Sequence, residues 1–97
     1  MDNNYKWLES ILTKEQLDKF NKLDDNTRYK CVEDREGADF ALDCEYTVKG
    51  WVERALFWLD SDDNLEDQVF INSLLEGGKN AIEEIDEYWY ITIEEVK

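Results

Sequence analysis

Residues 39–59, DFALDCEYTVKGWVERALFWL, change their hydrophobic period halfway and thereby indicate the fold class. Up to residue 48, apolar side chains occupy every second position, which is typical of a strand with one buried face. The residues expected on that face are Phe40, Leu42, Cys44, Tyr46 and Val48. Beyond residue 48 the apolar steps become three, one and three, which predicts a helix over residues 49–59, with a third strand as the alternative. That helix would bury Val48, Trp51, Val52, Ala55, Leu56 and Leu59.

A second strand is predicted just before this stretch. Residues 28–34 also alternate, and Gly37 supplies a turn, so residues 28–34 and 39–48 are expected to form an antiparallel hairpin. Cys31 and Cys44 would then lie near each other across the hairpin. Because two cysteines are too few for a disulfide scaffold, we expect reduced, partly buried thiols, with a single disulfide as the alternative.

The N-terminal segment predicts two short helices. Apolar residues at helical spacing mark the first, and Thr13 with Gln16 forms a capping box that opens the second. Leu17, Phe20 and Leu23 are expected to point inward from that second helix.

The C-terminal half predicts a further helix and a last strand. The helix holds Leu65, Val69, Phe70, Leu74 and Leu75. Gly77 and Gly78 can stop it, with a bent continuation to residue 86 as the alternative. Residues 88–93 are aromatic and β-branched, and they predict a strand that pairs with the hairpin. The expected fold is therefore α+β: one domain over residues 1–97, with a small antiparallel sheet (hairpin plus C-terminal strand) packed with three to five helices.

The charge of the chain is its most unusual property. Asp and Glu number 25 against 11 Lys and Arg, so the formal net charge is −14. This charge repels phosphates and anionic lipids, so we expect no direct binding to nucleic acid and no membrane partner. The imbalance is uneven, because residues 50–97 hold 13 acids and three bases. A charge of about 2–8 suffices to keep a small domain soluble, so the excess suggests a basic partner.

Catalytic and metal-binding motifs are missing from the sequence. There is no His, which excludes Ser-His and Cys-His nucleophile pairs, and we expect no enzymatic activity. Residues 60–71 begin like a calcium loop, but Leu65 and Ile71 stand where an EF-hand needs Gly and Glu. We therefore expect no dedicated metal site and no cofactor.

The N-terminus carries no basic region followed by an apolar run, so it does not look like a signal peptide. The longest apolar run, residues 55–59, is far shorter than the ~18 residues that would indicate a membrane span. These features predict a cytoplasmic protein.

Two dense acidic runs are the candidate partner-binding site. The first is expected to open a helix, where acids are also favoured by the helix dipole, and the second has Lys79 as its nearest base in sequence. The first run consists of Asp60, Asp62, Asp63, Glu66 and Asp67, and the second of Glu83, Glu84, Asp86 and Glu87. Acids three and four apart on a helix are ~5–6 Å apart at Cβ, so such rows approximate the regular charge of a nucleic-acid backbone. The aromatic residues would serve as anchors.

In length, charge, lack of a signal peptide and α+β make-up, the chain resembles the small acidic DNA-mimic inhibitors of phages and mobile elements, of the anti-CRISPR and anti-restriction type. The resemblance implies a target that normally holds DNA or RNA, such as a CRISPR effector complex or a restriction enzyme. The inhibitor would bind the basic groove and exclude the nucleic acid by competition. If the protein is phage-encoded, it would act in the cytoplasm of the host cell.

Two other functions remain open at this point. A cytoplasmic immunity protein that neutralises a nuclease toxin would also be small and acidic, and it would also block a basic cleft. An acidic accessory subunit is the third possibility. The partner distinguishes them: nucleic-acid machinery in the first case, and one cognate toxin in the second.

Overall fold

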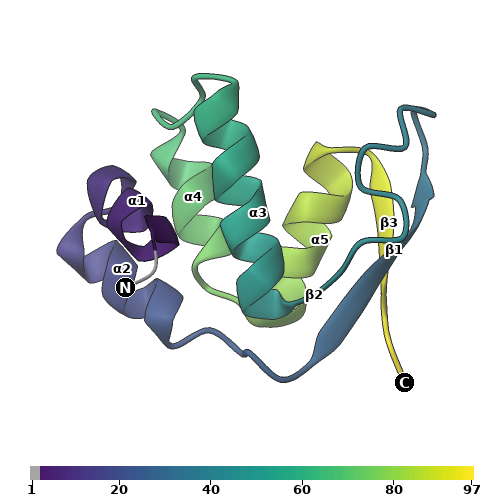
Figure 1. Ribbon diagram of the computed structural model, residues 1–97, viewed down its shortest axis with the longest axis horizontal. Coiled ribbons are helices and arrows are strands. Elements are labelled where there is room, and N and C mark those ends of the chain that lie inside the picture. Colours follow the sequence, from purple (N-terminus) through teal and green to yellow (C-terminus); the bar gives the residue numbers. More distant parts are fainter. Residues whose placement is uncertain (1–2) are drawn as a thin grey trace.

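The computed structural model describes residues 3–97, which form five helices and three strands (Figure 1). In chain order these are α1 Asn3–Ile11, α2 Lys14–Asn21, β1 Arg28–Asp34, β2 Glu45–Thr47, α3 Val48–Ser61, α4 Gln68–Leu74, α5 Gly78–Tyr88 and β3 Ile91–Glu95. The chain is an α+β protein with a small antiparallel sheet, as the sequence predicts.

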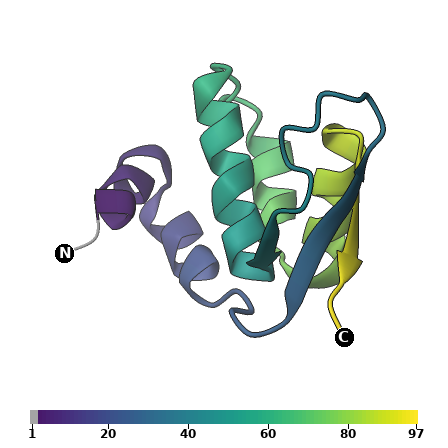
Figure 2. The ribbon, with the colours of Figure 1, turned by 45° about the vertical axis from the view of Figure 1, so that its right-hand side comes forward.

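The sheet has the order β2-β1-β3, so β1 is the central strand and β2 and β3 pair with its opposite edges. Both pairings are antiparallel, and a bulge between Cys31 and Glu33 interrupts the β1–β3 register. Helices α3, α4 and α5 lie between the sheet and the pair formed by α1 and α2 (Figures 1 and 2). The three-helix layer therefore has its apolar residues covered from both sides.

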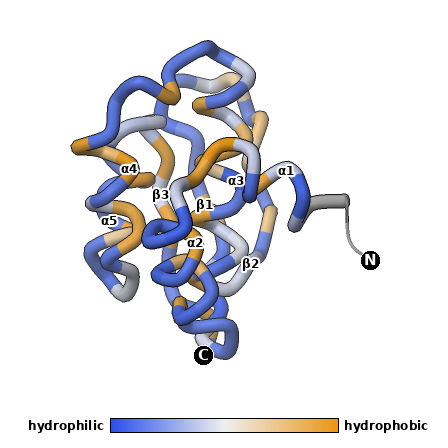
Figure 3. Tube along the Cα trace, turned by 90° about the vertical axis from the view of Figure 1, so that its left-hand side faces the viewer, coloured by the Kyte–Doolittle hydropathy of each residue, from blue (hydrophilic) through white to orange (hydrophobic). Residues whose placement is uncertain are grey.

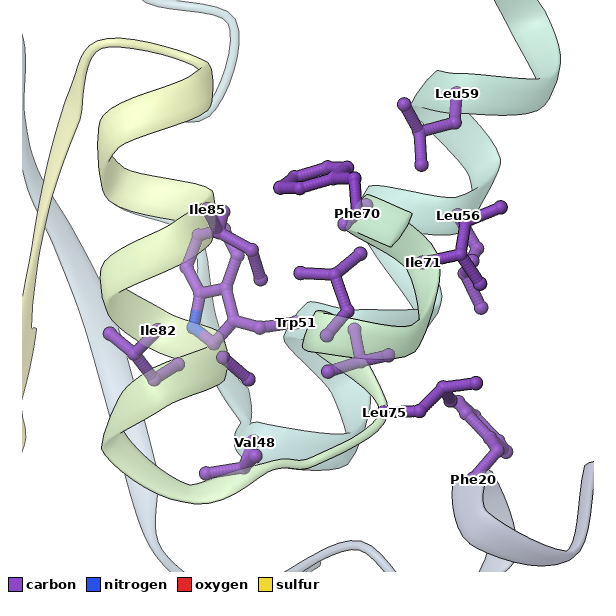
Figure 4. Close-up of a cluster of buried hydrophobic side chains, with 14 of the residues drawn as sticks. Phe20, Val48, Trp51, Leu56, Leu59, Phe70, Ile71, Leu75, Ile82 and Ile85 are labelled. Carbon is purple, nitrogen blue, oxygen red and sulfur yellow. The ribbon is translucent and has the colours of Figure 1, made fainter. Parts of the chain in front are cut away.

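Residues 49–59 are helical, and α3 buries the six residues predicted for its inner face. Trp51 is fully buried, and its indole N–H donates to the backbone carbonyl of Tyr29 at 2.9 Å. This bond satisfies the one polar atom of the indole and ties α3 to the central strand. In the core, Trp51 lies among Val48, Phe70, Ile82 and Ile85 (Figure 4).

The capping box at α2 is confirmed. The Thr13 hydroxyl accepts from the Gln16 backbone N–H at 3.1 Å, and the Gln16 side chain accepts from the Thr13 N–H at 3.0 Å. The Gln16 amide also donates to Gln68 and Asn72 of α4, so the capping residue joins two helices. Phe20 is buried, and Leu17 and Leu23 are partly buried, as predicted.

The prediction of a strand over residues 39–48 is wrong for its first half. Only Glu45–Thr47 pair as β2, and residues 39–44 form a loop in which Asp39 and Asp43 have positive φ. Phe40 and Leu42, predicted to face the core, are exposed, whereas Ala41 between them is buried. The left-handed aspartates break the extended backbone, and Phe40 packs on Trp58 instead of entering the sheet.

The C-terminal elements also differ from the prediction in their limits. Gly77 and Gly78 have φ of 73° and 60° and separate α4 from α5, so the helix stops there and a bent continuation does not occur. The φ of 73° at Gly77 disfavours any larger residue, and a Cβ there would also come within 2.7 Å of a terminal methyl of Leu23, which would have to move. The last strand begins at Ile91 rather than at residue 88, because Tyr88 completes α5.

The two cysteines lie across the hairpin from each other, as expected, and both are free thiols. The Cys31 backbone N–H donates to the Cys44 carbonyl at 2.9 Å. Cys31 is fully buried, and this burial raises the pKa of its thiol. A protonated, enclosed thiol is a poor nucleophile, so Cys31 acts as a small apolar core residue.

None of the helices formed by residues 3–97 has the length and apolar content needed to cross a lipid bilayer.

Candidate binding surface

The two acidic runs approach the same end of the molecule, because α3 and α5 both finish there (Figure 1). We call this the upper end, defined as residues 35–42, 60–68 and 84–91; it lies at the top of Figure 1. These segments contain ten acids and one base, Arg35. The opposite, lower end, defined as residues 45–50, 75–79 and 93–97, contains four acids and three bases. The negative charge is thus strongly polarised along the helix axes.

The first acidic run does not open a helix as predicted. α3 continues through Ser61, and α4 begins at Gln68, so the run occupies the end of α3 and the connecting loop. A helix C-terminus carries a partial negative charge, which makes Asp60 and its neighbours electrostatically unfavourable there. The last turn of α3 contains no basic residue to offset this repulsion. The helix dipole therefore does not explain the acids at the end of α3.

Two acids of the first run have defined roles in the fold. Asp60 accepts the Trp7 indole N–H at 2.9 Å, which fastens α1 to α3. Asp67 is the N-cap of α4, and its carboxylate accepts the Phe70 backbone N–H at 3.1 Å. The helix dipole therefore favours Asp67 alone in this run, at the start of α4 and not of the helix that was predicted.

The other three acids of the first run are exposed to solvent. Within residues 3–97, the carboxylates of Asp62, Asp63 and Glu66 take part in no ion pair and no side-chain hydrogen bond. No base occurs in the sequence between Arg54 and Lys79. These three carboxylates are consequently available to an external cation.

The second acidic run is distributed around α5. Asp86 accepts from the Arg35 guanidinium at 3.1 Å and from the Ile93 backbone N–H at 3.1 Å. Arg35 also donates to the Asp86 carbonyl and the Thr92 hydroxyl, so this cluster fixes the loop after β1 to α5 and β3. Arg35 is thus a partner for this run that the sequence order did not reveal, whereas Lys79, the nearest base in sequence, forms no ion pair with it among the described residues.

The remaining acids of the second run point in different directions. Glu83 borders a shallow hollow with Lys79, Ile93 and Glu94, on the side of β3. Glu84 lies one turn after Asn80, whose amide contacts Ser73 of α4, and one turn before Tyr88. Glu84 is therefore on the α4-facing side of α5, while Glu87 is exposed.

Five aromatic rings form a continuous cluster at the upper end, and the sequence did not single it out. Trp58 and Trp89 form its middle, at a centroid distance of 5.0 Å. Phe40 packs edge-on against Trp58 at 5.0 Å, while Tyr88 stacks on Phe70 at 4.4 Å and contacts Trp89 at 4.5 Å. The five residues come from a loop and three helices, so no local sequence pattern reports their contact.

The backbone at this end also adopts unusual conformations. Asp39, Asp63 and Tyr90 have positive φ, and all three lie in upper-end segments. Asp tolerates the left-handed region, but a bulky residue such as Tyr is rare there, and its strain must be offset by the surrounding structure. The Tyr90 carbonyl accepts the Arg35 backbone N–H at 2.9 Å, which holds this turn in place. Such conformations concentrate at functional sites.

A separate cleft of about 300 Å³ lies between α1 and α3. The Arg54 guanidinium borders it and sits over the rings of Tyr46 at 5.5 Å and Phe57 at 5.7 Å. In this cleft the protein itself combines an arginine with aromatic faces.

Within the described residues, no three cysteine or acidic side chains are grouped so that they could hold a metal ion. In the comparisons with known proteins, no family model, curated protein or solved structure matches this chain.

Proposed function

We propose that the protein is an acidic inhibitor that binds the basic nucleic-acid groove of a target such as a CRISPR effector complex or a restriction enzyme. By occupying the groove it would prevent the target from binding DNA. The observation that carries this proposal is the charge of the upper end. It contains ten acids and one base, and that base, Arg35, is already bonded to Asp86.

The physical basis is the field that this end projects. Partial negative charges at the C-termini of α3 and α5 add to the carboxylates around them. A groove lined by Lys and Arg would be steered toward such a surface as it is toward phosphate, which gives fast and salt-dependent association. The turns at the top of the molecule consist mainly of hydrophilic residues (Figure 3). Among them, Asp62, Asp63 and Glu66 are exposed to solvent.

Within the first acidic run, Asp62, Asp63 and Glu66 are the proposed interface residues. Asp60, Asp67 and Asp86 already hold parts of the fold together. Asp62, Asp63 and Glu66 have no such task among the described residues, although their position after α3 is unfavourable. Acids that cost stability without an internal partner are the best candidates for contact with an external one. The proposal places the protein in the cytoplasm, where such targets act.

The proposal is tested by affinity capture with three forms of the immobilised protein. These are the wild type, the variant D62K/D63K/E66K, and a matched control, E9K/D18K/E76K, with the same change in net charge at exposed positions elsewhere. From a bacterial lysate, the wild type and the control are expected to retain a nucleic-acid-binding protein that duplex DNA displaces. The first variant is expected to retain at least about ten-fold less of it, because close charge pairs in an interface are worth several kcal/mol. Circular dichroism checks that all three forms are folded.

Three results would contradict the proposal. Equal losses in both variants would mean that net charge, rather than this surface, is responsible. A retained protein that duplex DNA does not displace would exclude competition for the groove. Capture of a single nuclease toxin whose activity is blocked would favour the immunity protein instead.

A further inference from the structure

Two rings of the five-ring cluster are exposed to solvent. Phe40 is 47% exposed and Tyr88 is 41% exposed, while Trp58 and Trp89 are partly buried. Val69, next to Phe70 at the start of α4, is 84% exposed. We call this surface the aromatic face and define it by Phe40, Trp58, Phe70, Tyr88 and Trp89. The two exposed rings are connected through the contacts of Trp58 and Trp89, and exposed apolar surface of this kind is typical of a site of contact.

Four acids in three segments lie within one helical turn, along the chain, of rings of the aromatic face. Asp39 directly precedes Phe40, and the backbone N–H of Asp62 bonds to the Trp58 carbonyl at 3.1 Å, one turn away. Asp67 caps the helix at Phe70, and Glu84 lies one turn before Tyr88. We call these four acids the acidic rim, and three of them, Asp62, Asp67 and Glu84, belong to the acidic runs that the sequence indicated.

The charge of the rim selects the occupant. A second copy of this chain, with its own charge of −14, would be repelled, as would nucleic acid or an anionic membrane. An uncharged apolar guest would leave the rim unpaired. A guest that binds both the rings and the acidic rim needs a positive charge on a flat, weakly hydrated group. Among protein side chains this group is the arginine guanidinium.

The protein itself contains both contacts that such a guest would make. Arg54 rests over the rings of Tyr46 and Phe57, and Arg35 bonds to the Asp86 carboxylate. Guanidinium combines stacking on a ring with paired hydrogen bonds to a carboxylate, whereas the ammonium of lysine is a compact and strongly hydrated charge.

We propose that the aromatic face docks an arginine-bearing segment of the partner protein, with the guanidinium stacked on the exposed rings and bonded to the acidic rim. This inference rests on the proposed function for the basic nature of the partner. In this proposal the aromatic face distinguishes arginine from lysine, and the other exposed acids attract positive charge in general.

The test uses two synthetic peptides of equal length and charge, one with arginines and one with lysines, titrated into the full-length protein by calorimetry. The wild type is expected to bind the arginine peptide roughly three- to five-fold more tightly, as expected for a cation over an exposed ring. The variant Phe40→Ser is expected to lose this preference. The matched control is Phe57→Ser, which removes a ring of similar exposure, 50%, outside the aromatic face and should leave the preference unchanged.

A second pair of substitutions separates the rim from the rings. D39N/D62N keeps side chains of similar size, and Asn also tolerates the left-handed φ of 56° at position 39. This variant is expected to bind both peptides more weakly while still preferring arginine. Thermal melting followed by circular dichroism verifies that each variant is folded.

The inference is overturned if the wild type binds the two peptides equally or binds neither. It is also overturned if Phe40→Ser and Phe57→Ser lose the preference to the same extent. Self-association of the wild type that Phe40→Ser abolishes would identify the aromatic face as a contact between copies, and binding of a single-stranded oligonucleotide would identify it as a base-stacking surface. Because the proposed function is measured by displacement with duplex DNA, either proposal can fail while the other stands.

Discussion

The two ends of α3 lie in contrasting surroundings. At its start, Thr47 caps the helix, its hydroxyl donates to Asp25 at 2.8 Å, and Trp51 is sealed in the core with its N–H bonded. At its end, Trp58 is partly exposed, the last turn has no base, and Asp62 and Asp63 lie in the field of the helix C-terminus. The start of α3 therefore contributes to the stability of the fold, whereas the acids at its end reduce that stability. In a chain whose net stability is small, the region that reduces stability is where binding is to be sought.

Breaking the lower part of α3 should have the largest effect on the fold. Trp51→Ala removes a fully buried indole and is expected to lower the free energy of unfolding by about 3–5 kcal/mol. Trp58→Ala is expected to cost roughly half as much, because part of its ring is already in water. Urea denaturation followed by circular dichroism measures both values. If Trp51→Ala does not fold, Trp51→Phe still reports the loss of the bond to the Tyr29 carbonyl. Equal costs for the two alanine variants would refute the contrast between the ends.

The ion pair that anchors the upper end should matter more than the exposed pair at β2. Asp86→Ala leaves the Ile93 N–H and the Arg35 guanidinium without their carboxylate and is expected to cost about 1–2 kcal/mol. Glu45→Ala breaks the pair with Arg28, which is bonded at 2.7 Å but more exposed, and is expected to cost about 0–1 kcal/mol. Thermal melting ranks the two variants. A larger loss from Glu45→Ala would show that Asp86 is not the anchor.

Charge reversal at the end of α3 should raise stability slightly while it abolishes partner binding. In D62K/D63K/E66K, lysines replace acids in a repulsive cluster at a helix C-terminus, which favours the fold at low salt, whereas the lysine at position 63, where φ is 57°, adds some backbone strain. The net gain in stability is expected to be about a few tenths of a kcal/mol. The melting temperature in low and high salt measures this gain, which should shrink as salt screens the charges. A fall in melting temperature would mean that these acids stabilise the fold.

The smallest expected effect concerns the cysteines, which lie away from the upper end. Because burial raises the pKa of Cys31 above its ordinary value of 9.0, the unfolded chain releases this proton more readily than the folded chain. Stability from this group is therefore complete below pH ~9 and declines as the pH rises further.

Cys31→Ala should remove this decline between about pH 9 and 10, below the range in which Tyr29 contributes. The partly exposed Cys44 should also react with a thiol reagent before Cys31 does.

The double variant C31A/C44A is expected to keep full partner binding. Loss of binding in the folded double variant would point to redox or metal chemistry.

The sequence by itself determined the elements whose signals are local. Short-range hydrogen bonding explains the capping box at Thr13, and backbone freedom explains the helix stop at Gly77. Hydrophobic periodicity explains the six-residue inner face of α3 and the strand at residues 28–34. These are properties of neighbouring residues, so the expected fold class matched the observed one.

Only the tertiary structure decided how the candidate surface is built. Phe40 leaves the predicted strand because Trp58 offers it a ring contact, and Asp86 gains an arginine from 51 positions away. The first acidic run occupies the end of α3 and the loop after it rather than the start of a helix, because α4 begins only after its N-cap, Asp67. The five rings of the aromatic face are up to 49 positions apart in the sequence and meet only through contacts between elements. Composition records how many acids and rings a chain has, but packing determines which of them meet and which remain unpaired.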